Sequence, residues 1–124
     1  MFNLLQHRSM SIYKSLSLNI SLFFYLANML TRLDIENKLK QIKPELAEKF
    51  HVSRIGYFGS FANDIQNERS DLDLLVEFSE PIGWNFFTLE SYLEQIFGIP
   101  IDIVTKNALK DSIKEPILSQ VYYV

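Results

Sequence analysis

The run from Asp71 to Phe78 constrains this chain more than any other feature. Apolar and polar residues alternate there on the period of a β-strand, which places Asp71 and Asp73 on one face. The opposite face is apolar and consists of Leu72, Leu74, Val76 and Phe78. Side chains two residues apart on a strand point the same way, with backbones about 6.5–7 Å apart. Carboxylates paired in this way suit magnesium, a hard cation usually held by one or two carboxylates together with substrate phosphates.

Two further features accompany this acid pair. Gly59 and Ser60 precede it, and a Gly-Ser turn at the start of a helix can offer backbone N–H groups and a hydroxyl to a polyphosphate. Asp102 lies in a predicted strand over residues 99–105, on the face opposite its isoleucines. Ordinary strands are depleted in aspartate, and the like charges of three such residues repel each other unless a cation lies among them. The sequence therefore predicts metal-dependent chemistry on a nucleotide.

Length and composition exclude several classes of protein. The chain has 124 residues, enough for one domain with a modest core. Residues 1–32 carry three basic and no acidic residues, whereas the remainder carries nine basic and fifteen acidic ones. Such an acidic domain binds nucleic acid poorly, because neutralisation of phosphates by Lys and Arg dominates that affinity, so we expect no nucleic-acid template. The absence of cysteine excludes disulfides and thiolate chemistry and fits the cytoplasm. His7 and His51 lie apart, which argues against zinc.

The first thirty residues differ from the rest, and three interpretations stay open. Residues 16–30 are largely apolar and follow Arg8 and Lys14, as in a secretory signal, but no clear cleavage site follows. The stretch is shorter than the roughly 20 residues that span a bilayer, so we expect no membrane association. It could also be a partner-facing or core-covering helix. We favour the third interpretation, in which residues 1–30 are an extension outside a working domain at 31–124, with translation starting at Met10 or Met29.

The rest of the chain alternates helical and strand patterns. We expect helices at 33–50, 61–66, 84–97 and 108–119, strands at 54–58, 71–78 and 99–105, and a strand or surface segment at 121–124. Pro44 either kinks the first helix or opens a second short one, and Pro116 interrupts the last. The helix at 84–97 is expected to bury Phe87, Tyr92, Leu93 and Ile96. This order predicts an α/β (α+β) domain with a small mixed sheet covered on one face by helices, and with the three acids on the uncovered face.

These residues resemble the nucleotidyltransferase superfamily that includes DNA polymerase beta, and more narrowly its minimal bacterial and archaeal members, the MNT proteins. The resemblance rests on residues 58–62, 70–78 and 101–104 and covers about residues 33–124 with the spacing intact. A Gly-Ser pair followed by ten residues, Asp-x-Asp and a later strand aspartate is far more specific than a lone Asp-x-Asp. The resemblance implies the nucleotidyltransferase fold.

The resemblance also implies a role for each site residue. Gly59 and Ser60 would hold the β- and γ-phosphates of ATP. Asp71 and Asp73 would ligate two Mg²⁺ ions, while Asp102 would complete the metal nearer the acceptor and help to deprotonate the attacking hydroxyl. The implied reaction is attack on the α-phosphorus with release of pyrophosphate. MNT proteins are usually encoded with a helical HEPN partner, so the resemblance implies an antitoxin that adenylylates a tyrosine of that RNase toxin.

One departure from the family pattern follows the Gly-Ser turn. Family members commonly continue Gly-Ser-Phe-Ala with Arg-Gly, whereas this chain has Asn63 and Asp64. Asn and Asp tolerate left-handed backbone better than most residues, so the turn can survive the change. The lost arginine removes a positive charge beside the phosphates, which puts catalytic rate or phosphate affinity in question. Arg69 is a candidate replacement.

Other interpretations of the same residues remain. Asp71 and Asp73 could be solvated acids at a strand end, and Ser60 could be a helix N-cap. Trp84 and Phe86, if exposed, are candidates for a partner surface. A binding-only antitoxin is the main alternative to the enzyme, and transfer to a small molecule such as an aminoglycoside ranks below both, because those enzymes generally carry an additional helical domain. The sequence leaves homo- and hetero-oligomers open.

Overall fold

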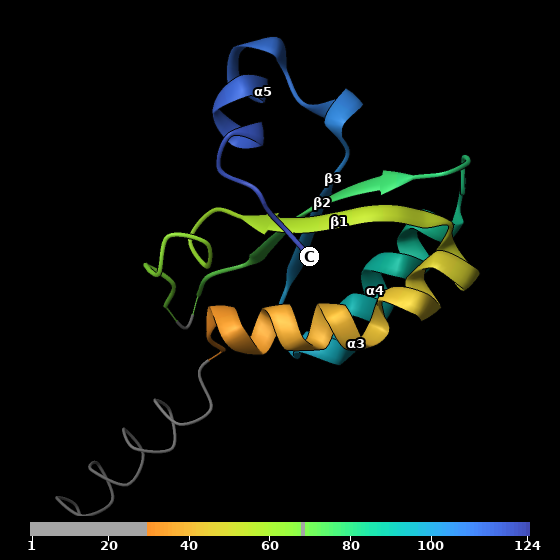
Figure 1. Ribbon diagram of the computed structural model, residues 1–124, viewed down its shortest axis with the longest axis horizontal. Coiled ribbons are helices and arrows are strands. Elements are labelled where there is room, and N and C mark those ends of the chain that lie inside the picture. The colour runs from red at the N-terminus through yellow and green to blue at the C-terminus, as the bar shows by residue number, and fades with distance from the viewer. Residues whose placement is uncertain (1–29, 68) are drawn as a thin grey trace, which may run out of the picture. The chain divides into compact units, whose positions relative to one another are not determined.

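Figure 1 shows the computed structural model, which describes residues 30–67 and 69–124. The predicted N-terminal extension over residues 1–30 lies outside the described residues, apart from Leu30. Within the described ranges, no helix combines the length and the apolar character that crossing a membrane requires.

The first described helix, α3, spans Arg32–Phe50, and a capping box fixes its start. The Thr31 hydroxyl accepts a hydrogen bond from the Asp34 N–H at 3.2 Å, and the Asp34 carboxylate accepts one from the Thr31 N–H at 3.0 Å. This reciprocal pair satisfies two N–H groups that the first turn cannot satisfy internally. The helix continues past Pro44, so that proline does not open a second helix.

Four strands form one mixed sheet in the order β3-β2-β1-β4. Their bounds are Val52–Phe58 for β1, Leu72–Phe78 for β2, Ile101–Val104 for β3 and Tyr122–Tyr123 for β4. β1 pairs antiparallel with β2 and with β4, whereas β2 pairs parallel with β3. Parallel neighbours need a crossover connection, which the helix α4 (Asn85–Phe97) supplies. The predicted small mixed sheet is therefore confirmed.

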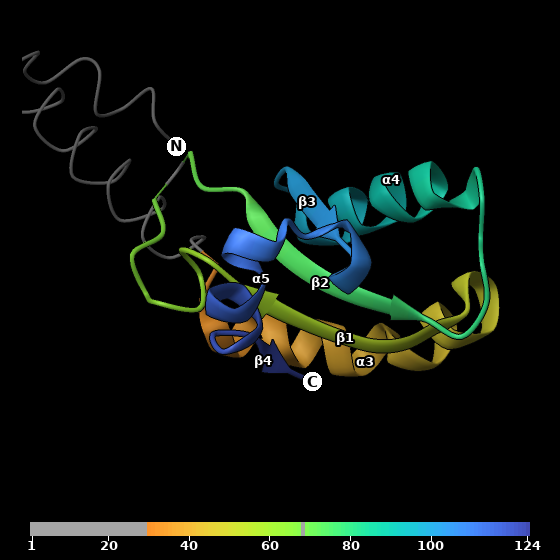
Figure 2. The same ribbon diagram turned by 90° about the horizontal axis from the view of Figure 1, so that it is seen from above.

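The helices divide between the two sides of this sheet. α3 and α4 lie along one face, while α5 (Asp111–Leu118) and a short 3₁₀ turn (Lys106–Ala108) lie on the other side (Figures 1 and 2). The core lies between the sheet and the α3–α4 pair, where burying each large apolar side chain contributes about 1.5–3 kcal/mol. Its fully buried members are Ile35, Leu39, Leu46, Ile55, Tyr57, Leu72, Leu74, Val76, Leu89 and Leu93.

The last residues form an edge strand that lies very close to β1. A Cβ atom on Gly56 would lie 2.5 Å from Val121 Cγ1 and 2.8 Å from the Tyr122 carbonyl oxygen, so only glycine admits this approach. The Val124 N–H donates to the Ile55 carbonyl at 3.0 Å. Of the two predictions for residues 121–124, the strand is therefore the one observed.

The predicted helix at 61–66 is wrong. The segment makes a single turn, closed by hydrogen bonds from the Asn63 N–H to the Gly59 carbonyl (3.2 Å) and from the Ile65 N–H to the Ser60 carbonyl (3.0 Å). Asp64 lies between them in the left-handed region, with φ 56°. A left-handed residue bridged by such a six-residue closure commonly ends a helix. The helical pattern therefore stops after its first turn.

Two predictions about the later helices are also wrong. Phe87 is 59% exposed, because the buried stripe of α4 runs through Leu89, Leu93 and Phe97 at a four-residue spacing that leaves Phe87 outside it. The final helix begins at Asp111 and includes Pro116 instead of being interrupted by it. The predicted burial of Leu93 is confirmed, whereas Tyr92 and Ile96 are only half-buried.

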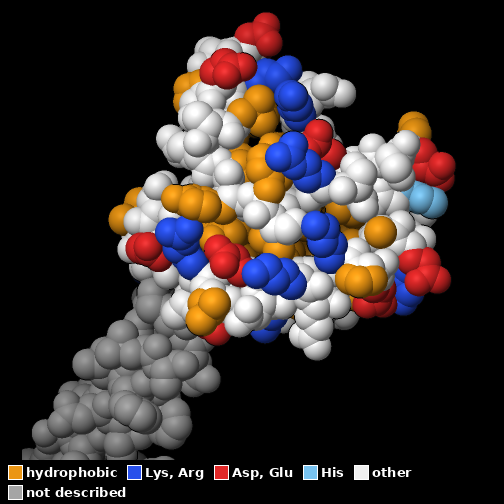
Figure 3. All heavy atoms as spheres, in the orientation of Figure 1, with side chains coloured by type: hydrophobic (Ala, Val, Ile, Leu, Met, Phe, Trp, Pro, Cys, Tyr) orange, Lys and Arg blue, Asp and Glu red, His pale blue; other side chains and the backbone are white. Residues whose placement is uncertain are grey.

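The described surface in view in Figure 3 mixes side chains of several kinds. Figure 3 shows Lys and Arg side chains beside Asp, Glu and hydrophobic ones, so no single sign of charge dominates the face in view.

Trp84 is 85% exposed, and its ring centroid lies 5.8 Å from that of Phe87. These two aromatic rings therefore form an exposed pair at the start of α4.

Candidate active site

The predicted site residues lie at one end of the sheet, where β1 ends and β2 begins. Phe58 pairs with Asp73 across the antiparallel ladder, and Gly59 follows directly. Asp73 also pairs with Asp102 across the parallel ladder. Neighbouring strands lie about 4.8 Å apart, and residues in register point to the same face. Asp73 and Asp102 are therefore side by side, although they are distant in the sequence. Asp71 lies just before β2 and is exposed.

Gly59 is required at its position for two reasons. Its φ of 76° lies in the left-handed region, which a side chain makes costly. A Cβ atom there would also lie 2.2 Å from Asp73 Oδ2, so the Asp73 carboxylate would have to move from its position against the turn. The missing side chain thus leaves room for the Asp73 carboxylate directly against the backbone of the turn. A phosphate held by this turn would lie beside that carboxylate.

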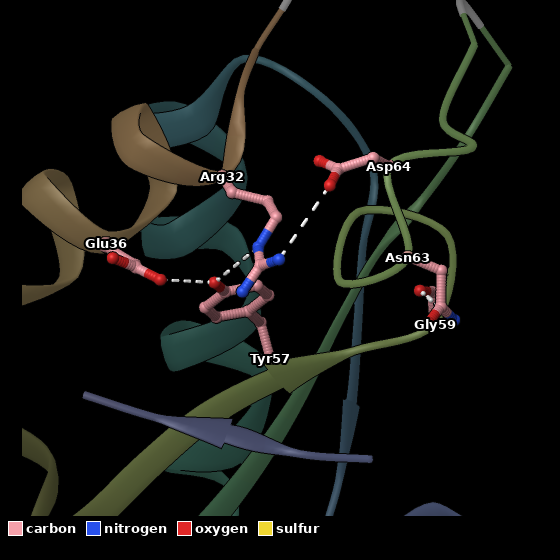
Figure 4. Close-up of polar contacts among 6 residues, drawn as sticks. All are labelled: Arg32, Glu36, Tyr57, Gly59, Asn63 and Asp64. Atoms are coloured by element: carbon pink, nitrogen blue, oxygen red, sulfur yellow. Dashed lines mark hydrogen bonds and ion pairs between the residues drawn. The ribbon is translucent and has the colours of Figure 1, made fainter.

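The turn after Gly59 is held by buried side chains and by hydrogen bonds. Phe61 and Ala62 are each only 3% exposed, so they anchor it in the core. The Asn63 side chain donates to the Gly59 carbonyl at 3.0 Å, in addition to the backbone N–H of the same residue (Figure 4). Asp64 adopts a left-handed backbone, which aspartate tolerates better than most residues. The Asn63–Asp64 sequence therefore keeps the turn closed.

The three acids influence each other electrostatically. Burial first, and then the negative charges of Asp102 and Asp71, raise the pKa of Asp73 to about 6. This direction means that the ionised form of Asp73 is disfavoured where it stands. A divalent cation near the carboxylate would remove that penalty, because its charge favours the ionised form.

The donor set fits magnesium in its chemistry, since it consists of carboxylate oxygens. Among residues 30–67 and 69–124, however, no three Asp, Glu, His or Cys side chains already converge on one point at which a metal could be held. Asp71 and Asp102 are exposed, and exposed side chains change rotamer within nanoseconds. The fit therefore rests on the backbone register of Asp73 with Asp102 and on the raised pKa of Asp73.

Sequence reasoning missed Arg32, which lies in the first turn of α3. Its Nε donates to the Tyr57 hydroxyl at 3.2 Å, and its guanidinium lies over the Tyr122 ring, 4.1 Å from the ring centroid. Its Nη1 lies 3.8 Å from Asp64 Oδ2, and the Tyr57 hydroxyl in turn donates to Glu36 (Figure 4). No periodicity or motif connects these positions, so the sequence held no signal for the cluster. The suggestion that Arg69 replaces the missing arginine stays a prediction.

An acid pair on neighbouring parallel strands, beside a glycine-led turn on a small mixed sheet, is the arrangement of a nucleotidyltransferase domain. The nucleotidyltransferase domain family matches residues 39–123, and the chain belongs to this family. The predicted class of enzyme and the predicted MNT resemblance are both confirmed.

Particular relatives narrow this class. Protein adenylyltransferase MntA of Thermococcus cleftensis is 44% identical over 97 residues, which cover 77% of this chain and 98% of that protein. A Methanocaldococcus jannaschii protein with a provisional assignment as a protein adenylyltransferase is 44% identical over 98 residues, covering 77% and 100%. A provisionally assigned minimal nucleotidyltransferase of known structure superposes with a TM-score of 0.64 at 28% identity, over 75% of this chain and 95% of that one. A toxin–antitoxin crystal structure with AMP-PNP shares the fold, with a TM-score of 0.58 at 20% identity. The superposition covers 71% of this chain and 70% of the other.

Proposed function

We propose that this chain is a magnesium-dependent antitoxin that transfers AMP from ATP to a tyrosine hydroxyl of a HEPN-type toxin. The observation that carries the proposal is the register of Asp73 with Asp102 beside Gly59, which gathers carboxylates next to a turn suited to phosphates. A relative with 44% identity is named a protein adenylyltransferase, which supports a protein as the acceptor. The fold shared with a toxin–antitoxin structure containing AMP-PNP supports a toxin partner and a nucleotide substrate.

In this mechanism the residues of the chain bind, orient and deprotonate. Backbone N–H groups of the turn at Gly59 and the hydroxyl of Ser60 bind the β- and γ-phosphates. Asp102, exposed beside Asp73, accepts the proton of the attacking hydroxyl. The hydroxyl oxygen forms a bond to the α-phosphorus, the bond from that phosphorus to the β-bridging oxygen breaks, and pyrophosphate leaves with the electron pair. The product is AMP joined to the acceptor oxygen.

Magnesium would be held by the carboxylates of Asp71, Asp73 and Asp102. When bound there, two such ions neutralise the negative charge of the phosphates and stabilise the entering and leaving oxygens. The task of the chain is to place these carboxylates on one face and to keep Gly59 without a side chain next to them.

The direct test is transfer of labelled AMP. The chain, magnesium and ATP labelled at the α-phosphate are incubated with a candidate HEPN-type partner protein. We expect label on the toxin, loss of the label when its acceptor tyrosine becomes phenylalanine, and no label with the Asp71→Ala, Asp73→Ala double variant. Glu77→Gln is the matched control, because Glu77 lies on the same strand four residues beyond Asp73 and should not affect transfer. An unlabelled toxin in the parent reaction would refute the proposal.

A second candidate is an antitoxin that neutralises its toxin by binding alone. The absence of three converging acids in the described ranges, and Asn63 in place of an arginine, favour it. Under this hypothesis the Asp71→Ala, Asp73→Ala variant would still protect cells that express the toxin. Loss of protection, with complex formation unchanged in a pull-down, would instead assign the protection to catalysis.

A further inference from the structure

We propose that Arg32 and Asp64 form a brace that positions the Gly59–Ser60 turn for the triphosphate, an inference that rests on the proposed function. The two residues come from different elements, the first turn of α3 and the end of the turn after β1, and their side chains lie 3.8 Å apart. Figure 4 shows the Arg32 guanidinium between Tyr57 and Asp64. Neither residue is assigned to contact the phosphates, so both are positioning residues.

The Arg32 end of the brace is fixed by aromatic residues. The guanidinium donates to the hydroxyl of Tyr57, a fully buried residue of β1 that lies two positions before Gly59. It also lies 4.1 Å from the ring centroid of Tyr122 on β4. A cation stacked on an aromatic face and bonded to a buried hydroxyl has few alternative positions. The charge of Arg32 is therefore held at the end of β1, from which the turn departs.

The Asp64 end transmits this position to the turn. Asp64 holds φ 56°, and the hydrogen bond from the Ile65 N–H to the Ser60 carbonyl closes around it. One residue earlier, Asn63 donates twice to the Gly59 carbonyl. Any shift of Asp64 therefore shifts the peptide groups of Gly59 and Ser60, which are the groups assigned to the phosphates.

Charge gives the brace a second effect. Asp64 is an acid in a turn assigned to an anionic ligand, and its negative charge repels phosphates. The Arg32 guanidinium, 3.8 Å away, offsets that repulsion. Removal of the Arg32 charge alone leaves the repulsion between Asp64 and the phosphates without compensation. Removal of both charges also removes that repulsion. This asymmetry separates the brace from a merely structural role of Arg32.

The test measures binding of AMP-PNP with magnesium by calorimetry. Because pairs this exposed contribute up to about 1 kcal/mol, we expect Arg32→Gln to raise the Kd about fivefold. Asp64→Asn, which keeps the tolerance for left-handed backbone, should have a smaller effect. Adding Asp64→Asn to Arg32→Gln should recover about twofold of the loss, and high salt should shrink the differences. Lys49→Gln is the control, since it breaks the 2.7 Å pair with Glu45 at the far end of α3 and should leave the Kd unchanged.

The outcomes separate this inference from the proposed function. A parental Kd for Arg32→Gln, or an absence of recovery in the double variant, would overturn the brace. If Arg32→Gln raises the Kd for AMP-PNP and the double variant lowers it again, but the parent transfers no label to the toxin, the brace is supported and the transfer of AMP is refuted. A parent that binds no AMP-PNP would overturn both. If thermal unfolding shows that Arg32→Gln is too unstable, the test uses the NMR chemical shifts of the Ser60 and Ile65 backbone amides in Asp64→Asn. Shifts identical to those of the parent would mean that the turn has not moved, which contradicts the brace.

Discussion

The two faces of β2 differ in polarity at the end of the strand where Asp73 lies. Toward α3 and α4 the strand presents Leu72, Leu74 and Val76, all fully buried. Toward the other side it presents Asp73, whose pKa is raised to about 6 by burial and by two neighbouring acids. Leu75, two residues along on the same side as Asp73, is only 1% exposed, so the free-energy cost on that side is confined to the end of the strand at Asp73. A step of one residue along the strand thus separates a fully buried leucine from a carboxylate whose ionised form is disfavoured.

The free-energy cost at Asp73 is consistent with the catalytic role proposed for it. Functional sites commonly hold groups that the rest of the fold must compensate. Here the compensation comes from the apolar face of the same strand and from the helices packed against it. Substitutions on the two faces should therefore affect different properties, one the rate of transfer and the other the free energy of unfolding.

The largest expected effect belongs to Asp73→Asn. This change removes a carboxylate assigned to magnesium, and a loss of several kcal/mol of transition-state stabilisation corresponds to a rate lower by about a thousandfold or more. The thermal midpoint of the metal-free protein should stay the same or rise, because the repulsion among the acids is relieved. Steady-state transfer of AMP and thermal unfolding measure the two effects. A variant that loses stability together with activity would show that the faces are not separate.

Leu74→Ala tests the opposite face. Leu74 is fully buried next to Asp73, and truncation of such a leucine costs about 3 kcal/mol through lost burial and the cavity left behind. Urea unfolding measures the loss in free energy of unfolding. The folded fraction should retain its affinity for AMP-PNP, and a proportionate drop in that affinity would contradict the separation.

The pH dependence of stability gives an intermediate effect. The pKa of Asp73 is raised to about 6 in the folded, metal-free protein, so the folded state binds this proton more tightly than the unfolded state does. The resulting stabilisation is complete below about pH 4 and is lost as the pH rises through 6. After allowance for solvent, we expect a difference of about 1–2 kcal/mol between the parent and Asp73→Asn to develop over that range. Urea titrations across the range measure it, and magnesium at pH 7 should restore the stability of the parent alone. A pH-independent difference would contradict the assignment.

The smallest expected effect comes from Phe87, which sequence reasoning placed in the core. Because its ring is 59% exposed, Phe87→Ala should change the free energy of unfolding by no more than about 0.5 kcal/mol. Leu93→Ala on the same helix should cost about 3 kcal/mol, because Leu93 is fully buried. Equal losses in the two variants would show that Phe87 is buried after all.

Local patterns predicted the parts of this structure that local forces decide. The alternation from Asp71 to Phe78 gave β2 to within one residue and assigned the correct face to Asp73. The prediction of a helix at 61–66 was wrong because Asp64 adopts a left-handed backbone that ends the turn. The pattern of apolar residues contains no information about that backbone conformation. The prediction that Phe87 is buried was wrong, because the spacing of apolar residues does not show which side of α4 packs against the sheet.

Long-range contacts account for the rest. Arg32 reaches Tyr57, Tyr122 and Asp64, residues that share no spacing or motif with it. Only the order of the strands brings those positions together. The register of Asp73 with Asp102 was foreseen as a shared face, but the adjacency of the two carboxylates needed the parallel pairing of β2 and β3.

That parallel pairing also fixes when Asp73 and Asp102 can come together during synthesis of the chain. A nascent chain that has emerged from the ribosome only as far as β2 carries Asp73 without its neighbour, because Asp102 arrives after the whole of α4. Antiparallel hairpins assemble as they are translated, whereas a crossover must wait for its returning strand. Incomplete translation products that stop before β3 therefore carry the Gly-Ser turn but lack the complete set of acids.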